Sequence, residues 1–186
     1  MKFIAPLSLI SMLALAGGSA QAQVYLEGQA SLGKAPKTLC DSMASCKTRS
    51  LDGRLTLGYG FGNGLGVEAG LAGYGMAKAG NDTTGLKRKV GGGQLGISYR
   101  HPLNNELTLD TRAGLTRARM TTESWTDKVK AGDKHIDSTG PYVGVGVSYR
   151  LSEGLSLGGM LDLTHLKVDN GHKRFTNLGV TLRKTF

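Results

Sequence analysis

The strongest constraint on the fold of this chain is an alternation of apolar and polar residues that recurs from residue 23 onward. In its first instance Val24, Leu26 and Leu32 take one side of the segment, and Glu27 and Gln29 take the other. A period of two residues is that of a β-strand, whose successive side chains point to opposite faces. No segment after residue 23 has the spacing of an amphipathic helix. The sequence therefore predicts an all-β protein.

Eight segments carry this alternation, and turn-forming residues separate them. They span residues 24–32, 51–61, 65–72, 93–100, 107–116, 142–150, 155–164 and 177–186. Their lengths are close to the roughly 9–11 residues with which a tilted strand crosses a membrane. We therefore predict one domain at residues 23–186, folded as an eight-stranded antiparallel up-and-down transmembrane β-barrel.

The connections between these segments alternate between short and long. Tight turns are expected at residues 62–64, 101–106 and 152–154, long loops at 33–50, 75–90 and 117–140, and a shorter loop at 168–174. This asymmetry is typical of bacterial outer-membrane barrels, and an even strand number places both termini with the tight turns, in the periplasm. Outward aromatic residues beside the tight turns or the C-terminus predict a periplasmic aromatic girdle. Its members are Tyr59, Phe61, Tyr99, Tyr149 and Phe186.

One face of every predicted strand is almost wholly apolar, and the other carries nearly all the strand charges. A charge that faces hydrocarbon at mid-membrane costs about 2–4 kcal/mol, so the apolar face points to lipid and the polar face to the lumen. A water-soluble barrel such as a lipocalin would expose a polar face rich in Lys and Glu, whereas this face is mostly Gly, Ser and Thr. The charges assigned to the lumen are Glu27, Arg54, Glu68, Asp110, Arg112, Asp162 and Arg183.

The lumen of an eight-stranded barrel is only wide enough for its own side chains to fill it. Because buried charges need partners, we expect the lumen charges to pair across the barrel as a structural salt-bridge plug. A narrow gated pore is the alternative. Arg100 and Arg150, near the periplasmic mouth, are expected to contact solvent instead.

The first 22 residues differ from the rest of the chain. Lys2 precedes an apolar stretch at residues 3–16, and small residues follow, ending in Ala20-Gln21-Ala22. This is the pattern of a secretory signal peptide, and it predicts cleavage after Ala22. The apolar stretch is shorter than the roughly 20 residues that a spanning helix needs. An uncleaved membrane anchor is the alternative.

Export also bears on the two cysteines, Cys40 and Cys46. An exported chain passes through an oxidising compartment, so we predict that they form a disulfide that closes a short loop. A metal-binding pair is the alternative, but no nearby His or Cys completes a ligand set. No metal is therefore predicted.

Some residue patterns in the sequence resemble catalytic or cofactor-binding motifs, but each lacks the neighbouring residues or elements that its chemistry needs. G-x-G-x-x-G at residues 91–96 matches a dinucleotide-binding fingerprint, but that motif needs a helix after it, and here a strand continues. The histidines lack the spacing of a metal site: His101, His135, His165 and His172. Small-barrel lipid A deacylases carry an outward His with a Ser two residues later, and after His165 that position is Lys167. We predict no enzymatic activity and no cofactor, with a lipid-modifying enzyme as an alternative.

Three further features carry a family resemblance. The predicted mature chain opens with VYLEG at residues 24–28, contains PYVGVGVSYRL at residues 141–151, and ends in Phe186 after alternating apolar residues. These features resemble the small eight-stranded OmpA/OmpX-like outer-membrane barrels of Gram-negative bacteria. The resemblance implies that the barrel assembly machinery recognises the last strand, although Lys184 departs from the aromatic or apolar residue usual there. Because the sequence ends at Phe186, we expect the periplasmic domain of full-length OmpA proteins to be absent. We also expect the protein to be a monomer.

The remaining chemistry is in the predicted loops, which concentrate the positive charge of a chain with formal net charge +9. The basic loop surface comprises Lys34, Lys37, Lys47, Arg49, Lys78, Lys87, Arg88, Lys89, Lys128, Lys130, Lys134, Lys173 and Arg174. Such a surface implies anionic partners. The nearest are the phosphates of lipopolysaccharide in the same leaflet, and anionic host or matrix polymers are the sharper possibility. The sequence thus predicts a structural or adhesin-like surface-interaction barrel that binds no nucleic acid.

Overall fold

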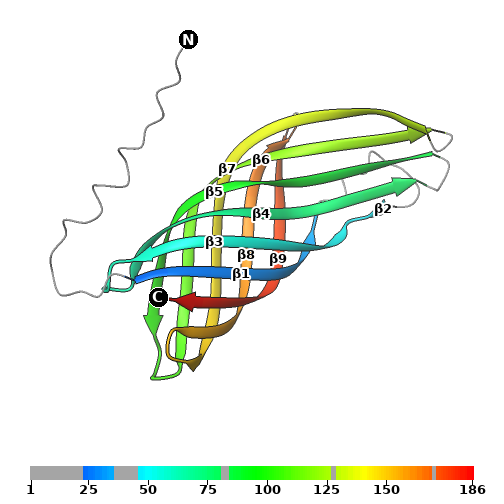
Figure 1. Cartoon of the computed structure of the whole chain (residues 1–186). Helices are drawn as coiled ribbons and strands as arrows, with labels where there is room; N and C mark the ends of the chain where they lie inside the picture. The colour runs from blue at the N-terminus through cyan, green and yellow to red at the C-terminus, as the bar shows by residue number, and fades with distance from the viewer. Residues whose placement is uncertain (1–22, 36–45, 81–83, 127–128, 169–170) are drawn as a thin grey trace, which may run out of the picture.

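The computed structural model describes residues 23–35, 46–80, 84–126, 129–168 and 171–186. These residues form eight long strands and one two-residue strand (Figure 1). The strands are β1 (Gln23–Lys34), β2 (Cys46–Lys47), β3 (Arg49–Gly60), β4 (Leu65–Gly80), β5 (Thr84–Pro102), β6 (Leu107–Thr126), β7 (Val129–Ser152), β8 (Leu155–Val168) and β9 (Gly171–Thr185). Within the described ranges there is no helix long and apolar enough to cross a membrane.

The strands form one closed antiparallel sheet. Neighbours follow the order β2-β4-β3-β1-β9-β8-β7-β6-β5, and a further pairing of β4 with β5 closes the sheet on itself. The short strand β2 pairs with β4 near its end, Cys46 opposite Ala79 and Lys47 opposite Lys78. Closure leaves every long strand hydrogen-bonded on both sides, as a strand in hydrocarbon requires. The predicted eight-stranded up-and-down β-barrel is confirmed.

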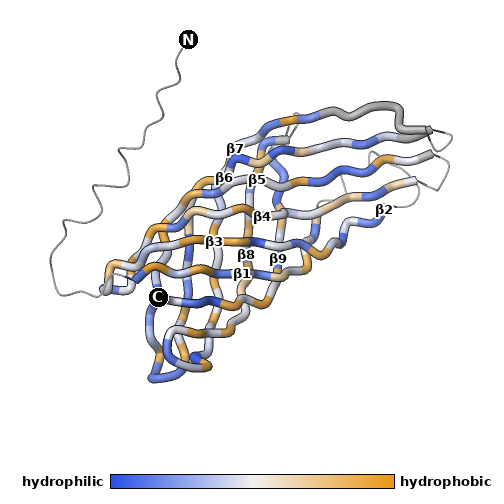
Figure 2. The backbone as a smooth tube through the Cα atoms, in the orientation of Figure 1, coloured by the Kyte–Doolittle hydropathy of each residue, from blue (hydrophilic) through white to orange (hydrophobic). Residues whose placement is uncertain are grey.

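Alternation along each strand separates a polar interior from an apolar exterior. On β1, Glu27 is 2% exposed and Gln29 is 6% exposed, whereas Leu26 is 42% exposed and Leu32 is 67% exposed. This inverts the arrangement of a water-soluble protein, because the exposed apolar side chains face lipid. Figure 2 shows the same alternation in the half of the barrel near the tight turns, where hydrophobic and hydrophilic positions interchange along the strands.

Tight turns join the strands at the end of the barrel where both described termini lie. Gly62 and Gly64 adopt positive φ angles of 77° and 88° between β3 and β4, and Gly154 adopts 70° between β7 and β8. Left-handed conformations of this kind are cheap only for glycine. Between β5 and β6 the side-chain oxygen of Asn104 accepts hydrogen bonds from the backbone N–H groups of Glu106 and Leu107.

The opposite end differs from the sequence-based expectation. Residues 75–90 and 117–140 were predicted as long loops, but strand pairing continues through their described residues, as far as Gly80 opposite Gly85 and Thr126 opposite Val129. The long strands β4 to β7 therefore extend the barrel well beyond the apolar belt (Figure 1). The prediction was wrong because it ended each strand where outward apolar residues stop. Beyond lipid, a paired strand is equally stable with Lys, Arg or Thr on its outer face.

The extension contains a β-bulge and a hydrophobic core of its own, distinct from the polar interior of the rest of the barrel. The β4–β5 register shifts between Gly73 and Gly75, and Gly75 takes a φ of 135°. The extra residue moves the inward positions of β4 from Ala72 and Tyr74 to Ala77 and Ala79. Inside the extension apolar side chains pack together: Ala35, Ala72, Tyr74, Ala77, Ala79, Val90, Ala118, Met120, Leu166 and Phe175. The extension is thus a packed barrel end with its own hydrophobic core.

Candidate functional site: lumen network and outer cationic band

An ion-pair network crosses the lumen near the end with the tight turns. Glu27 accepts hydrogen bonds from the guanidinium groups of Arg112 at 2.9 Å and Arg183 at 2.6 Å. Arg183 also donates to Asp110 at 3.0 Å. These residues come from β1, β6 and β9, so the network ties together strands on opposite sides of the barrel. All four side chains are nearly inaccessible to solvent.

A third carboxylate, Asp162, continues the network along the barrel axis. Asp162 accepts hydrogen bonds from Arg54 at 2.8 Å and from the Gln29 side-chain amide at 2.9 Å. Arg112 Nε lies 3.5 Å from Asp162 Oδ1, so Arg112 links this carboxylate to Glu27. Six of the seven predicted lumen charges are therefore joined by ion pairs. Removing one partner of such a buried pair typically costs about 3–5 kcal/mol, because the other charge is left without compensation.

The seventh predicted lumen charge, Glu68, is held by tyrosines instead of an arginine. Its carboxylate accepts hydrogen bonds from the hydroxyls of Tyr142 at 2.9 Å and Tyr25 at 3.2 Å. The Arg183 guanidinium lies 4.5 Å from the centre of the Tyr25 ring, and Arg54 lies 5.7 Å from that of Tyr142. Both tyrosines follow the polar phase of the predicted segments 24–32 and 142–150, but the predicted lumen network included only charged residues. Their position in the polar phase of strands that carry buried charges could have indicated that their hydroxyls bind a lumen carboxylate.

Arg100 and Arg150, the two arginines predicted near the mouth of the lumen at the tight-turn end, differ in their surroundings. Arg150 is exposed, as expected. Arg100 is half-buried: its side chain keeps 31% exposure to solvent, and its Nε also lies 3.1 Å from Asp110 Oδ1, an ion pair that the sequence did not predict. Asp110 thus holds two arginines, and Ser148 donates a further hydrogen bond to it. The network therefore reaches to the rim of the barrel.

Beyond the network, the lumen is filled by apolar and aromatic packing. The hydroxyl of Tyr74 lies 2.6 Å from Thr116 Oγ1 and donates to Gln94 at 3.3 Å. The core of the extension follows directly, with Leu166 and Phe175 fully buried. Side chains of the described residues therefore occupy the interior at both levels.

The predicted basic loop surface lies mainly on strands. Its outward-facing members, together with Arg117, Arg119 and Lys167, form what we call the outer cationic band. The band comprises Lys34, Lys47, Arg49, Lys78, Lys87, Lys89, Arg117, Arg119, Lys167 and Arg174. Arg88 and Lys173 do not belong to it, because they lie opposite the buried Ala77 and Leu166 and so follow the inward phase of their strands.

Several predicted residues fall outside the described part of the structure. Lys37, Lys128 and Cys40 are among them, and the side chains of Lys130, Lys134 and Cys46 are likewise not described. The Cys40–Cys46 disulfide, like the signal peptide at residues 1–22, stays a prediction. Within the described residues there is no group of three or more His, Cys, Asp or Glu side chains that could hold a metal ion.

Three members of the outer cationic band contact carboxylates. Arg119 of β6 donates to Asp137 at 2.8 Å, Arg117 lies 3.8 Å from the same carboxylate, and Lys89 of β5 lies 3.6 Å from Glu123. The hydrogen bond from Arg119 holds the pKa of Asp137 below its usual range.

Three other members are exposed cations on neighbouring strands. Lys34 of β1 lies directly opposite Arg49 of β3, and Arg174 is exposed on β9. Within the described residues, none of these three cations has a carboxylate partner.

The aromatic residues lie at the tight-turn end. Phe61, Tyr99, Tyr149 and Phe186 are exposed by 41%, 42%, 44% and 74% respectively. The rings of Tyr59 and Phe61 contact edge-to-face with their centroids 5.4 Å apart. These positions border the apolar belt on the side opposite to the outer cationic band.

Comparison with known protein families agrees with this architecture. The family described as outer membrane protein beta-barrel domain matches residues 3–186. The chain belongs to this family. The resemblance to small outer-membrane barrels is thereby confirmed, and the outer membrane is the location of the protein. A comparison with curated protein sequences found no match.

Solved structures with the same fold include three outer-membrane proteins. Neisserial surface protein A (NspA) is 19% identical, with a TM-score of 0.66 over 89% of this chain and 99% of that chain. A major outer membrane protein of Thermus thermophilus is 17% identical, with a TM-score of 0.56 over 89% and 100% of the two chains. Ail of Yersinia pestis, in complex with the heparin analogue sucrose octasulfate, is 14% identical, with a TM-score of 0.53 over 87% and 97%. At these identities the likeness shows the fold alone.

Proposed function

We propose that this outer-membrane barrel is a non-enzymatic surface protein whose outer cationic band binds polyanions, with lipopolysaccharide as its nearest partner. The observation that carries the proposal is the position of the unpaired cations. Lys34 and Arg49 lie two residues beyond the lipid-exposed Leu32 and Leu51 on their strands, about 7 Å further along. Phosphate groups of a lipid occupy that depth, where the hydrocarbon ends.

The orientation proposed here places the extended end outside the cell and both termini in the periplasm. Short periplasmic turns and longer extracellular segments are usual for outer-membrane barrels. The exposed aromatic residues at the tight-turn end would then form the girdle at the inner interface, as such rings prefer headgroup depth. Insertion through the barrel assembly machinery after signal-peptide cleavage, and a monomeric state, belong to the same proposal.

Electrostatics favours an anionic partner at this surface. Directly opposite side chains on antiparallel strands have Cβ atoms about 5 Å apart, and like charges in such a pair destabilise the sheet. Lys34 and Arg49 form such a pair with no carboxylate nearby in the described structure. A phosphate or sulfate between them replaces repulsion by two attractions.

Sulfated polymers are the second candidate partner. Ail of Yersinia pestis, which shares the fold, was solved with the heparin analogue sucrose octasulfate. The chemistry shared with lipopolysaccharide is a dense array of acidic groups, and the same outer cationic band would serve both. The filled lumen disfavours the alternative function as a narrow pore, so we expect no ion conductance in planar bilayers.

The test compares binding of lipopolysaccharide and heparin to barrel refolded in neutral phospholipid. We expect the double variant Lys34→Gln/Arg49→Gln to bind lipopolysaccharide about tenfold more weakly at low salt, from the loss of two exposed charge contacts. The difference should shrink at physiological salt, where the Debye length is about 8 Å. Arg150→Gln, an exposed cation at the opposite end, is the matched control. Unchanged affinity of the double variant for both polyanions would refute the proposal.

A further inference from the structure

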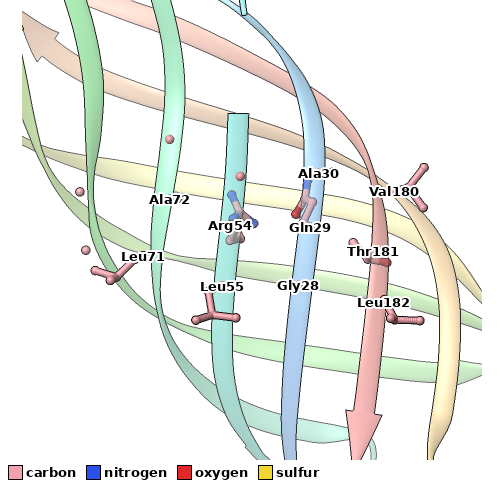
Figure 3. Close-up of a pocket in the computed structure, with 14 residues that line it drawn as sticks. Gly28, Gln29, Ala30, Arg54, Leu55, Leu71, Ala72, Val180, Thr181 and Leu182 are labelled. Carbon is pink, nitrogen blue, oxygen red and sulfur yellow. The ribbon is translucent and has the colours of Figure 1, made fainter. Parts of the chain in front are cut away.

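A groove of about 850 Å³ lies on the lipid-facing side of the barrel, over β9, β1, β3, β4 and β5. Figure 3 shows β1, with Gly28 and Ala30, between β3 with Leu55 and β9 with Val180 and Leu182. The groove is walled by side chains that stand out from the barrel surface, with Leu55 54% exposed and Leu71 68% exposed. Its floor consists of small residues of neighbouring strands.

The floor glycines are not required by the packing of the barrel itself. A Cβ atom at Gly28 would have no atom within 4 Å, and one at Gly53 would come no closer than 3.8 Å to the backbone oxygen of Gln29. Neither position needs a positive φ angle. Glycine weakens a strand interior, and it is found there at bulges, at tight bends and where a ligand or another backbone approaches closely.

The unpaired cations Lys34 and Arg49 lie beyond one end of the groove, on two of the strands that line it. On β3, Gly53 lies four residues from Arg49, and on β1, Ala30 lies four residues from Lys34. Four residues of strand span about 13 Å, with Leu32 and Leu51 between the groove and the cations. A lipid whose phosphate contacts Lys34 and Arg49 therefore directs its acyl chains along the groove.

We propose that this groove holds one acyl chain of the lipid A part of lipopolysaccharide, while Lys34 and Arg49 hold a lipid A phosphate. This site rests on the proposed function and adds the hydrocarbon half of the ligand to it. The complementarity is double, because apolar side chains wall the groove and two cations lie beyond its end on the same strands.

A second copy of the barrel fits the groove less well than an acyl chain. Docking of two barrels through this face would bring two Lys34–Arg49 pairs toward each other without a described carboxylate to separate them. The projecting Leu55 and Leu71 would also hold a flat barrel surface away from the glycine floor. A flexible chain of methylene groups meets neither obstacle.

The test fills the groove and leaves the cations in place. The variants are Gly53→Leu and, separately, Gly28→Leu, refolded in neutral phospholipid and checked for correct folding by the mobility of unheated samples on gels. The control is Gly159→Leu on β8, a lipid-exposed position outside the groove where a Cβ would come no closer than 4.0 Å to another atom. Binding is measured for intact lipopolysaccharide and for chemically deacylated lipopolysaccharide, which keeps the phosphates and lacks the chains.

The proposed site predicts different results for intact and for deacylated lipopolysaccharide. Gly53→Leu and Gly28→Leu should bind intact lipopolysaccharide about fivefold more weakly, from the loss of many small dispersion contacts, and deacylated lipopolysaccharide normally. Gly159→Leu should match the unmodified protein in both arms. If correctly folded groove variants bind intact lipopolysaccharide as tightly as the control, the acyl-chain site is refuted. If instead filling the groove abolishes cross-linked barrel dimers, the groove is a self-association surface and the proposal also fails. Failure of the proposed polyanion binding would be seen separately. In that case Lys34→Gln/Arg49→Gln would bind both intact and deacylated lipopolysaccharide as tightly as the unmodified protein.

Discussion

The lumen network makes a specific prediction for Glu27→Gln. This change keeps the size and shape of the side chain and removes its charge. In the structure the Glu27 carboxylate lies 2.9 Å from Arg112 and 2.6 Å from Arg183, with all three side chains at most 5% exposed. Two guanidinium groups therefore lose a shared counter-charge inside the barrel.

The size of the expected loss of stability depends on the carboxylates that remain beside Arg112 and Arg183. At an effective dielectric constant of 20, two unit charges about 4 Å apart attract by about 4 kcal/mol, so the gross loss from two pairs is large. Arg183 still contacts Asp110 at 3.0 Å, and Arg112 still lies 3.5 Å from Asp162. The neutral amide is also easier to bury than the carboxylate. We therefore expect a net loss of about 3–5 kcal/mol in the free energy of unfolding.

The assay is urea unfolding in phospholipid vesicles, followed by the folded fraction on unheated gels. Glu153→Gln, at an exposed turn position, is the control and should change stability by no more than about 0.5 kcal/mol. In the double variant Glu27→Gln/Arg183→Gln the second change should cost less than it does alone, with a coupling of about 1–3 kcal/mol. A loss below about 1 kcal/mol for Glu27→Gln would show that water solvates these charges and would refute the structural plug.

Three further predictions concern other parts of the barrel. Tyr142→Phe should cost about 2 kcal/mol, because the hydrogen bond that its hydroxyl donates to the Glu68 carboxylate is lost, whereas Tyr99→Phe, at an exposed position of the tight-turn end, should change the free energy of unfolding by less than about 0.5 kcal/mol. Alkylation without reductant should label neither Cys40 nor Cys46 if they form the predicted disulfide, and labelling of both would contradict it. The folded protein should migrate faster on gels before heating than after, and protease should spare its strands, because a closed barrel has no free edge; complete digestion would contradict the fold.

The sequence by itself determined the all-β class, the strand number, the side of each strand that faces lipid and the turns at one end. These follow from local chemistry: alternation with period two assigns each side chain to a face, and the cost of charges in hydrocarbon decides which face points outward. It also assigned Glu27, Arg112 and Arg183 to the lumen, because charged residues in the inward phase have nowhere else to go.

Only the tertiary structure decided what those residues contact and where the strands end. Barrel register sets Glu27 of β1 beside Arg112 of β6, 85 positions apart in the chain, and a distance of that kind has no local signal. The same closure makes Tyr25 and Tyr142 the partners of Glu68. Strand pairing carries the barrel past the apolar belt, because each backbone hydrogen bond depends on the neighbouring strand and not on the side chain's polarity. The unpaired Lys34–Arg49 couple above the glycine groove exists only in that closed sheet.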